Sequence, residues 1–182
     1  MDLENKVSLV TGAGQGIGEG IAMTLAKKGS KVIVVDLNQE SSAKVAGEIN
    51  DKFPNSACSF QADLTKSDEI KHMLEFGVTK FSKIDCICNN AAASKGIGPV
   101  EDYSLEDVQA TLDLTFTCLW KCLQAEIKFL KKQAILASVV NISSNSAIKG
   151  YAFNSIYAAS KAAVNNLTQS IAKEIARNHI RV

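Results

Sequence analysis

The feature that most constrains this chain is a glycine-rich turn that follows its first run of apolar residues. The run occupies Lys6–Val10, and residues 11–18 read Thr-Gly-Ala-Gly-Gln-Gly-Ile-Gly at the start of a helical apolar pattern. Backbone N–H groups in such a turn can face a pyrophosphate, and a Cβ would hold the phosphate away. The strict G-x-G-x-x-G pattern does not fit, but G-x-x-x-G-x-G fits at Gly12, Gly16 and Gly18. A turn without a ligand is the alternative, and the order of strand, loop, helix and second strand favours a dinucleotide site.

The rest of the chain alternates short apolar runs with helical patterns. Because the strand-like runs are nearly all apolar, they favour a parallel sheet with both faces covered. We therefore expect an α/β fold, a doubly wound parallel sheet of the Rossmann type in three α/β/α layers, with residues 1–182 as a single domain. The expected strands are Lys6–Val10, Lys31–Val35, Ala57–Gln61, Ile84–Cys88 and Ala137–Ile142. The expected helices after the glycine turn are Ser41–Lys52, Lys66–Phe81, Leu105–Leu130 and Ser155–Arg177.

Composition and charge argue against several classes of protein. Lys and Arg number 20 against 19 acidic residues, so neither nucleic acid nor a membrane surface is expected as the main partner. The first residues do not read as a signal peptide, and no apolar stretch has the length that a bilayer requires. Two pairs among the five cysteines could each be half a metal site, but neither His72 nor His179 completes one, so no metal is expected. Free thiols favour a cytoplasmic location.

Asp36 follows the second strand-like run. A carboxylate at this position can accept hydrogen bonds from both hydroxyls of an adenosine ribose and would repel a 2′-phosphate, so NAD is favoured over NADP. Neither Gln15 nor Leu37 supplies a cation for a 2′-phosphate. A solvated acid at a strand end is the alternative for Asp36 alone, and the adjacent glycine turn favours the ribose site.

Tyr157 and Lys161 are four residues apart in an expected helix and therefore share one face. A phenol with an ordinary pKa of about 10 is a poor base at neutral pH, and a nearby ammonium lowers that pKa. A drop of about 3 units corresponds to roughly 4 kcal/mol, which a desolvated lysine and a cofactor cation can supply. The phenol can then exchange a proton with a substrate hydroxyl while hydride moves to or from a nicotinamide. The alternative is a chance pair, since many helices carry Tyr and Lys at this spacing.

Polar residues also follow two further strands, at the edge where open α/β sheets bind their ligands. Ser143 and Ser144 follow the run that ends at Ile142, and Ser144 could donate a hydrogen bond to a substrate carbonyl oxygen. Asn89 and Asn90 end the preceding run and could fix the backbone or a cofactor ribose. Strand-end caps or turns are the alternative for either pair taken alone.

These motifs occur together in the order of a known family, and the chain resembles the short-chain dehydrogenases/reductases over its whole length. The resemblance rests on Thr11, Gly12, Gly16, Gly18, Asp36, Asp63, Leu64, Asn89, Asn90, Ala91, Ser144, Tyr157 and Lys161. It implies that Tyr157 is the acid/base and that Lys161 lowers the pKa of Tyr157 and holds the nicotinamide ribose. It also implies that Ser144, a better match than Ser143, positions the substrate oxygen. The rival aromatic residue, Tyr151, has no lysine four residues later.

The resemblance implies a complete set of cofactor contacts as well. Asp63 looks like the acid that contacts the adenine, and Asn89 looks like a residue that lines the adenosine ribose side of the pocket. The expected cofactor-binding residues are Gly12, Gln15, Gly16, Ile17, Gly18, Asp36, Asp63, Leu64, Asn89, Ala91, Tyr157 and Lys161.

The chain departs from the family pattern in three places. Asp113 stands where the family has a catalytic asparagine, and because an ionised Asp cannot donate and adds negative charge near Lys161, we expect an altered proton relay. Ala92 replaces a family glycine. The chain ends at Val182, whereas the family continues through a Pro-Gly loop, a mobile substrate lid and a final strand. Since Ile180–Val182 look like the beginning of a strand, we expect an incomplete domain that lacks its last strand or strands and its lid.

The resemblance implies an NAD(H)-dependent oxidoreductase that interconverts a secondary alcohol and a ketone by hydride transfer. The alternative is a catalytically impaired or non-catalytic NAD-binding or scaffold protein, which Asp113 and the expected missing segment favour. A methyltransferase also uses glycine loops, but it gives no reason for Tyr157 and Lys161. The expected partners are a small-molecule alcohol or ketone and further copies of the chain, in a homodimer or homotetramer paired through Leu105–Leu130 and the helix from Ser155.

Overall fold

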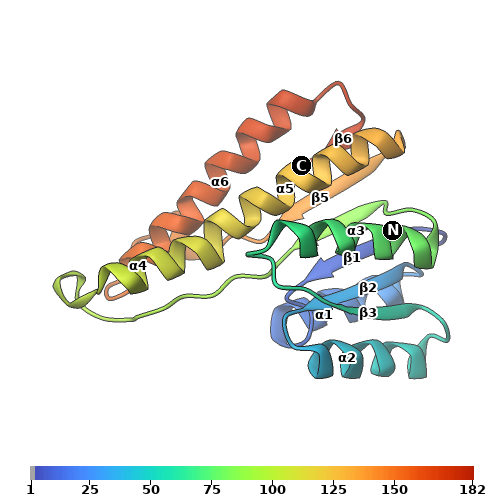
Figure 1. Cartoon of the computed structure of the whole chain (residues 1–182), viewed down its shortest axis with the longest axis horizontal. Coiled ribbons are helices and arrows are strands. Elements are labelled where there is room, and N and C mark those ends of the chain that lie inside the picture. Colours follow the sequence, from blue (N-terminus) through green and yellow to red (C-terminus); the bar gives the residue numbers. More distant parts are fainter. Residues whose placement is uncertain (1–2) are drawn as a thin grey trace.

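The computed structural model describes residues 3–182, and its centre is a six-stranded parallel sheet (Figure 1). The strand order is β3-β2-β1-β4-β5-β6, so the chain winds outward from β1 in both directions. This order confirms the expected doubly wound α/β fold. The strands are β1 (Val7–Thr11), β2 (Lys31–Asp36), β3 (Ala57–Gln61), β4 (Cys86–Asn89), β5 (Ala137–Asn141) and β6 (Ile180–Arg181).

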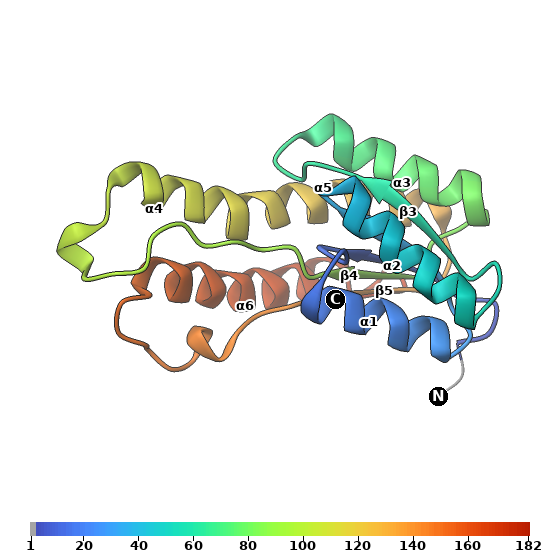
Figure 2. The same cartoon turned by 90° about the horizontal axis from the view of Figure 1, so that it is seen from below.

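Helices cover both faces of the sheet (Figure 2). One core cluster joins α1 (Gly16–Lys27) and α2 (Gln39–Lys52) to one face, through residues such as Ala22, Ala46 and Val34. A larger cluster joins the other face to three helices: α3 (Ser67–Phe81), α5 (Cys118–Gln133) and α6 (Ser155–Ile175). Successive side chains of a strand point to opposite faces, so β2 supplies Ile33 to one cluster and Val34 to the other. Both faces of the central strands are therefore covered by helices, as the apolar strands predicted.

The helix expected over Leu105–Leu130 is interrupted. The structure has α4 (Leu105–Leu112), a π-helical turn η2 (Asp113–Thr117) and then α5, so the uninterrupted helix was wrong. The N–H of Cys118 donates to the carbonyl of Asp113 five residues earlier, which widens the helix by one residue. The hydroxyl of Thr115 in this turn donates to the Ala93 carbonyl at 2.7 Å, which fastens η2 to the extended segment after β4.

Beyond the sheet, α4 and the first half of α6 form an arm that projects away from the other helices (Figures 1 and 2). The extended segment after β4 runs along this arm, where the Thr111 hydroxyl accepts from the Lys95 N–H at 2.8 Å and donates to the Lys95 carbonyl at 2.9 Å. Ser104 caps α4 by accepting a hydrogen bond from the Asp107 N–H. Within residues 3–182, none of the helices combines the length and the apolar character needed to cross a membrane.

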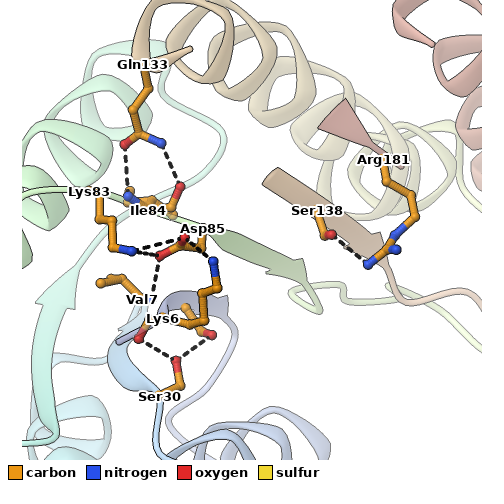
Figure 3. A network of polar contacts seen from close by, with 10 residues as sticks. Lys6, Val7, Ser30, Lys83, Ile84, Asp85, Gln133, Ser138 and Arg181 are labelled. Atoms are coloured by element: carbon orange, nitrogen blue, oxygen red, sulfur yellow. Dashed lines mark hydrogen bonds and ion pairs between the residues drawn. The ribbon is translucent and has the colours of Figure 1, made fainter. Parts of the chain in front are cut away.

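At the amino ends of the central strands, Asp85 joins β1 to β4 (Figure 3). Its carboxylate accepts from the Val7 N–H at 2.9 Å, the Lys6 ammonium at 3.1 Å and the Lys83 ammonium at 3.0 Å, while only 6% of its side chain is exposed. Burial acts to raise the pKa of Asp85, but these hydrogen bonds outweigh it and the pKa is lowered. Nearby, the Gln133 amide forms two hydrogen bonds with the backbone of Ile84, of 2.9 and 2.8 Å, and so ties the end of α5 to the start of β4.

We expect Asp85→Asn to lower the free energy of unfolding by roughly 1–3 kcal/mol at neutral pH, because the variant loses the charge that both lysines and the Val7 N–H contact. A lowered carboxyl pKa contributes stability above its ordinary value of 3.8, and that stability is lost as the pH falls through the lower pKa of the folded state. The difference between the two proteins should therefore vanish in acid. Urea unfolding at several pH values measures this difference in the free energy of unfolding.

Glu48→Gln, which removes an exposed ion pair with Lys44, is the control and should lower the free energy of unfolding by less than about 0.5 kcal/mol. Equal losses in both variants would contradict the role of Asp85.

Candidate functional site

A cavity of about 650 Å³ lies at the carboxyl ends of β1, β2, β3, β4 and β5, opposite the Asp85 contacts. It is lined by residues from the glycine turn, from four strand ends and from η2, α5 and α6. The lining residues are Gly12, Gln15, Gly16, Ile17, Val35, Asp36, Leu37, Ala62, Asp63, Leu64, Thr65, Asn90, Ala91, Ala92, Ala93, Leu114, Cys118, Ile142, Ser143, Tyr157 and Lys161. The parallel sheet thus gathers segments that are far apart in the sequence along one edge.

The glycine turn needs its glycines for two different reasons. Gly12 and Gly16 both have a φ of +60°, a conformation that side chains disfavour. A Cβ on Gly18, by contrast, would overlap the Gly12 carbonyl oxygen and lie 2.6 Å from the Asn90 amide nitrogen. A Cβ on Gly16 would meet nothing within 4 Å, so Gly16 faces open space at the cavity wall. Gly18 therefore serves the packing of the turn, and Gly16 leaves room for another molecule.

The carboxylate of Asp36 closes one end of the cavity. One of its oxygens accepts from the Gly14 N–H at 2.9 Å and the other accepts from the Asn38 N–H at 3.0 Å. Each carboxylate oxygen has two acceptor sites, so both can still accept from hydroxyl groups in the cavity. Leu37 beside it is exposed and carries no charge.

Asp63 stands on the neighbouring wall and is oriented by its own loop. Its Oδ1 accepts from the Thr65 hydroxyl at 2.7 Å and from the Thr65 N–H at 3.0 Å, and Lys66 lies 3.5 Å from Oδ2. The hydrogen bonds from Thr65 lower the pKa of Asp63, so the group is an anion at neutral pH. Leu64 and Thr65 line the cavity beside it.

The structure corrects the expected position of Asn89. Its side chain points into the core, where its amide donates to Glu126 at 3.0 Å and to Asn141 at 3.1 Å, and it does not line the cavity. Asn90 lines the cavity instead, and its amide donates to the carbonyls of Thr11 and Gly12 at 3.1 and 3.0 Å. Asn89, the last residue of β4, therefore forms hydrogen bonds inside the core, and Asn90, the next residue, holds the glycine turn against β4.

Lys161 and Tyr157 stand at the other end of the cavity, on the first turns of α6. The Lys161 ammonium donates to the Ile142 carbonyl at 2.7 Å and lies 5.8 Å from the centre of the Tyr157 ring. Only 4% of Lys161 is exposed. Burial lowers the pKa of Lys161, and the neighbouring Cys118 thiol acts in the opposite direction. The two side chains that sequence spacing paired are therefore brought together at the cavity wall.

The two serines after β5 have different surroundings. Ser143 lines the cavity, and its hydroxyl donates to the Lys161 carbonyl at 3.3 Å. The Ser144 hydroxyl accepts from the Ser146 N–H at 3.1 Å and caps the short helix η3 (Asn145–Ala147). Ser144 does not belong to the cavity wall in this structure.

Asp113 also lies away from the cavity wall. It accepts a hydrogen bond from the Gln109 amide at 3.1 Å, one helical turn earlier. The residues that face the cavity from this part of the chain are Leu114 and Cys118, which sequence reasoning missed. The π turn sets which residues of α5 face the cavity, and a regular helical periodicity carries no signal for it.

The cysteines of the chain are buried or half-buried thiols. All five are free, and burial raises the pKa of each thiol, including that of Cys88 to about 11. Residues 3–182 contain no group of three or more His, Cys, Asp or Glu side chains that could hold a metal ion.

Comparisons of sequence and of structure all match this chain to dehydrogenases, reductases or oxidoreductases. The profile described as "short chain dehydrogenase" matches residues 6–182. The chain is 32% identical to an uncharacterized oxidoreductase of Staphylococcus epidermidis, across 99% of this chain and 76% of that protein. It is 36% identical to a 3-oxoacyl-[acyl-carrier-protein] reductase of Synechocystis, across 99% of this chain and 72% of that protein. An NAD+-bound xylitol dehydrogenase superposes with a TM-score of 0.94 at 31% identity, covering all of this chain and 69% of that one.

We expect Gly18→Ala to lower the free energy of unfolding by roughly 1–3 kcal/mol, because the new methyl group overlaps the Gly12 carbonyl in a turn that cannot yield. Gly20→Ala on the same helix is the matched control, since a Cβ there meets nothing within 4 Å. That control should stabilise α1 by about 0.5–1 kcal/mol. Thermal and urea unfolding measure both, and a harmless Gly18→Ala would contradict the close packing of the turn.

Proposed function

Since the chain belongs to the short-chain dehydrogenase family, we propose that it is an NAD(H)-dependent oxidoreductase that interconverts a secondary alcohol and a ketone. The observation that carries this proposal is the pairing of Tyr157 with a buried Lys161 at one end of a cavity whose other end holds Asp36. A family assignment supports oxidoreduction in general. The choice of cofactor, the type of substrate and the role of each residue are proposals that rest on this geometry.

The cavity fits a dinucleotide on three observations. Gly16 faces open space, so the backbone of the turn allows a close approach by phosphate groups. The turn leads into the N-terminus of α1, whose unpaired N–H groups favour an anion. Asp36 and Asp63 line the end expected to hold the adenosine. When bound, a nicotinamide cofactor supplies or accepts the hydride.

Asp36 is the residue that favours NAD. Both of its oxygens retain capacity to accept hydrogen bonds from ribose hydroxyls, and its charge repels a phosphate at the same place. The side chains beside it on the cavity wall, Leu37 and Gln15, carry no positive charge to offset that repulsion.

At the reacting end, Lys161 is proposed to stabilise the phenolate of Tyr157. The ammonium is shielded from water and donates to the neutral Ile142 carbonyl. No carboxylate within residues 3–182 forms an ion pair with it that would neutralise its charge. Tyr157 then takes a proton from an alcohol hydroxyl during oxidation and returns it to the carbonyl oxygen during reduction. A serine hydroxyl would hold that oxygen: we assign this role to Ser144, and the position of Ser143 on the cavity wall makes Ser143 its competitor.

A second candidate function is cofactor binding with little or no turnover. Asp113 favours it, because this carboxylate stands at the family's asparagine position, is hydrogen-bonded to Gln109 and does not reach the cavity wall. The two functions make the same prediction for NAD binding and differ in turnover.

We also propose that copies of the chain associate through α5 and α6. Trp120 on α5 is 45% exposed, which is unusual for so large an apolar side chain and typical of a residue covered by a partner.

We expect Asp36→Asn to weaken NAD binding by roughly tenfold to a hundredfold, because neutral amide contacts replace charge-assisted hydrogen bonds to the ribose. The affinity for NADP should increase, since the variant no longer repels the extra phosphate of NADP. Isothermal titration calorimetry with both nucleotides measures the change. Asp51→Asn, an exposed acid on α2, is the control and should leave both affinities unchanged. An equal loss for NAD and NADP would contradict the assignment.

We expect Tyr157→Phe to lower kcat by at least about 100-fold while NAD affinity changes far less, because the variant keeps the ring and loses the acidic proton. NADH absorbance with a panel of small secondary alcohols and ketones measures turnover. Tyr151→Phe, in an exposed aromatic residue six positions earlier, should have no effect. Equal activity of the Tyr157 variant and the wild type would contradict the proposed acid/base. NAD binding by the wild type without turnover of any substrate would favour the second candidate function.

A further inference from the structure

Glu126 is a buried acid that the proposed chemistry does not use. It lies on α5, its exposed fraction is 0%, and one carboxyl oxygen, Oε2, accepts from the Asn89 amide at 3.0 Å. Its other oxygen, Oε1, is buried without a hydrogen bond, and the same is true of the Asn89 amide oxygen, Oδ1. An acceptor left without a donor inside a protein is costly, and here two such oxygens belong to side chains already in contact.

The orientation of the Asn89 amide is determined by a chain of donors. The Thr168 hydroxyl on α6 donates to the Val164 carbonyl at 2.8 Å, and the Asn141 amide nitrogen donates to Thr168 at 3.0 Å. The Asn141 oxygen is therefore an acceptor, and it receives the second hydrogen of the Asn89 amide nitrogen at 3.1 Å. Reversing the Asn89 amide would place acceptor against acceptor at both Asn141 and Glu126.

A single proton on Glu126 would supply the donor that this pair of side chains lacks. With its hydrogen on Oε1, the acid would donate to Asn89 Oδ1 while Oε2 continues to accept from Asn89 Nδ2, which would give an acid–amide pair with two hydrogen bonds. The ionised form has no hydrogen to donate, so it leaves both buried oxygens without a partner. No lysine, arginine or histidine within residues 3–182 forms an ion pair with Glu126.

The electrostatic surroundings favour the same protonation state. Burial raises the pKa of Glu126 to about 7, although the Asn89 hydrogen bond opposes the rise. The titratable groups that interact with it are the thiols of Cys88 on β4 and Cys122 on α5. Burial raises the pKa of both thiols as well, so both are neutral at pH 7, and a thiol supplies no positive charge that would stabilise an ionised Glu126.

We infer that Glu126 is held as a neutral acid, that its proton closes a second hydrogen bond to Asn89, and that this acid–amide pair is a positioning element behind the cavity. Asn89 is the last residue of β4 and directly precedes Asn90, which holds the glycine turn. Asn141 is the last residue of β5 and directly precedes Ile142, whose carbonyl holds the Lys161 ammonium. Ionisation of Glu126 would therefore disturb the glycine turn and the Lys161 contact from the core side. The inference concerns the folded chain itself and does not depend on which ligand binds.

Glu126→Gln tests the inference because a glutamine amide reproduces the neutral acid: its nitrogen donates to Asn89 and its oxygen accepts. A carboxyl whose pKa is raised on folding stabilises the protein below its ordinary pKa of 4.5, and that stability is lost as the pH rises to about 7. Between about pH 4.5 and pH 7, Glu126 alone should increase the unfolding equilibrium constant of the wild type by up to about tenfold per pH unit. Relative to the wild type, the glutamine variant should be similar at about pH 5 and more stable above about pH 7.

Two further variants separate the titration from other effects. Glu174→Gln makes the same chemical change at an exposed position of α6 and should follow the wild-type pH profile. Glu126→Leu leaves the Asn89 amide unpaired, so it should be less stable than the wild type at about pH 5 and should also lack the pH-dependent loss. Infrared spectra at about pH 5 should contain one protonated-acid carbonyl band in the wild type that is missing in Glu126→Gln.

Amide NMR signals test the positioning role without any ligand. In the wild type, the backbone signals of Asn90 and Lys161 should titrate together with a midpoint near the pKa of Glu126, about 7. In Glu126→Gln they should not titrate over that range. A glutamine variant that is less stable than the wild type above about pH 7, or that follows a parallel pH profile, would overturn the inference. So would Asn90 and Lys161 signals that titrate equally in both proteins.

Discussion

The cavity depends on the parallel pairing of β1 with β2 on one side and with β4 on the other. Parallel pairing brings the carboxyl ends of these strands to one edge, so the glycine turn after β1, Asp36 at the end of β2 and Asn90 after β4 become neighbours. Asn90 then joins the strand ends directly, because its amide donates to the carbonyls of Thr11 and Gly12. On the opposite edge, Asp85 joins the same two strands at their beginnings.

The charges of the cavity wall are distributed in a way that matches the proposed ligand. Among the lining residues, the acids Asp36 and Asp63 lie toward the end where we propose that the adenosine binds, and Lys161 lies at the end where we propose that the reaction occurs. Acids accept hydrogen bonds from hydroxyl and amino groups and repel an additional phosphate, whereas a buried cation favours the phenolate that oxidation of an alcohol requires. The middle of the wall presents backbone and small side chains, including Gly16 and Ala91, so it offers space to a pyrophosphate.

Features set by local sequence could be predicted, and features set by tertiary contacts could not. Three features can be recognised within a few residues of sequence: the glycine turn, Asp36 after its strand, and the pair of Tyr157 and Lys161. The structure brings all of them to one cavity. The side chain of Asn89 was assigned to the ribose pocket, because its partner Glu126 lies 37 residues away and gives no signal in the strand pattern. The π turn at Asp113–Thr117 was missed for a similar reason, since Thr115 is fastened to the distant Ala93.

The central claim is that one dinucleotide spans the cavity from the glycine turn to the first turns of α6. Amide chemical-shift mapping of the isotopically labelled chain during a titration with NAD+ tests it most directly. We predict saturable shifts that occur together at Asp36 and Leu37, at Gly12–Ile17 and at Tyr157–Lys161. Saturable shifts confined to the distant arm around Ile97–Tyr103, or no saturable shift, would contradict the claim.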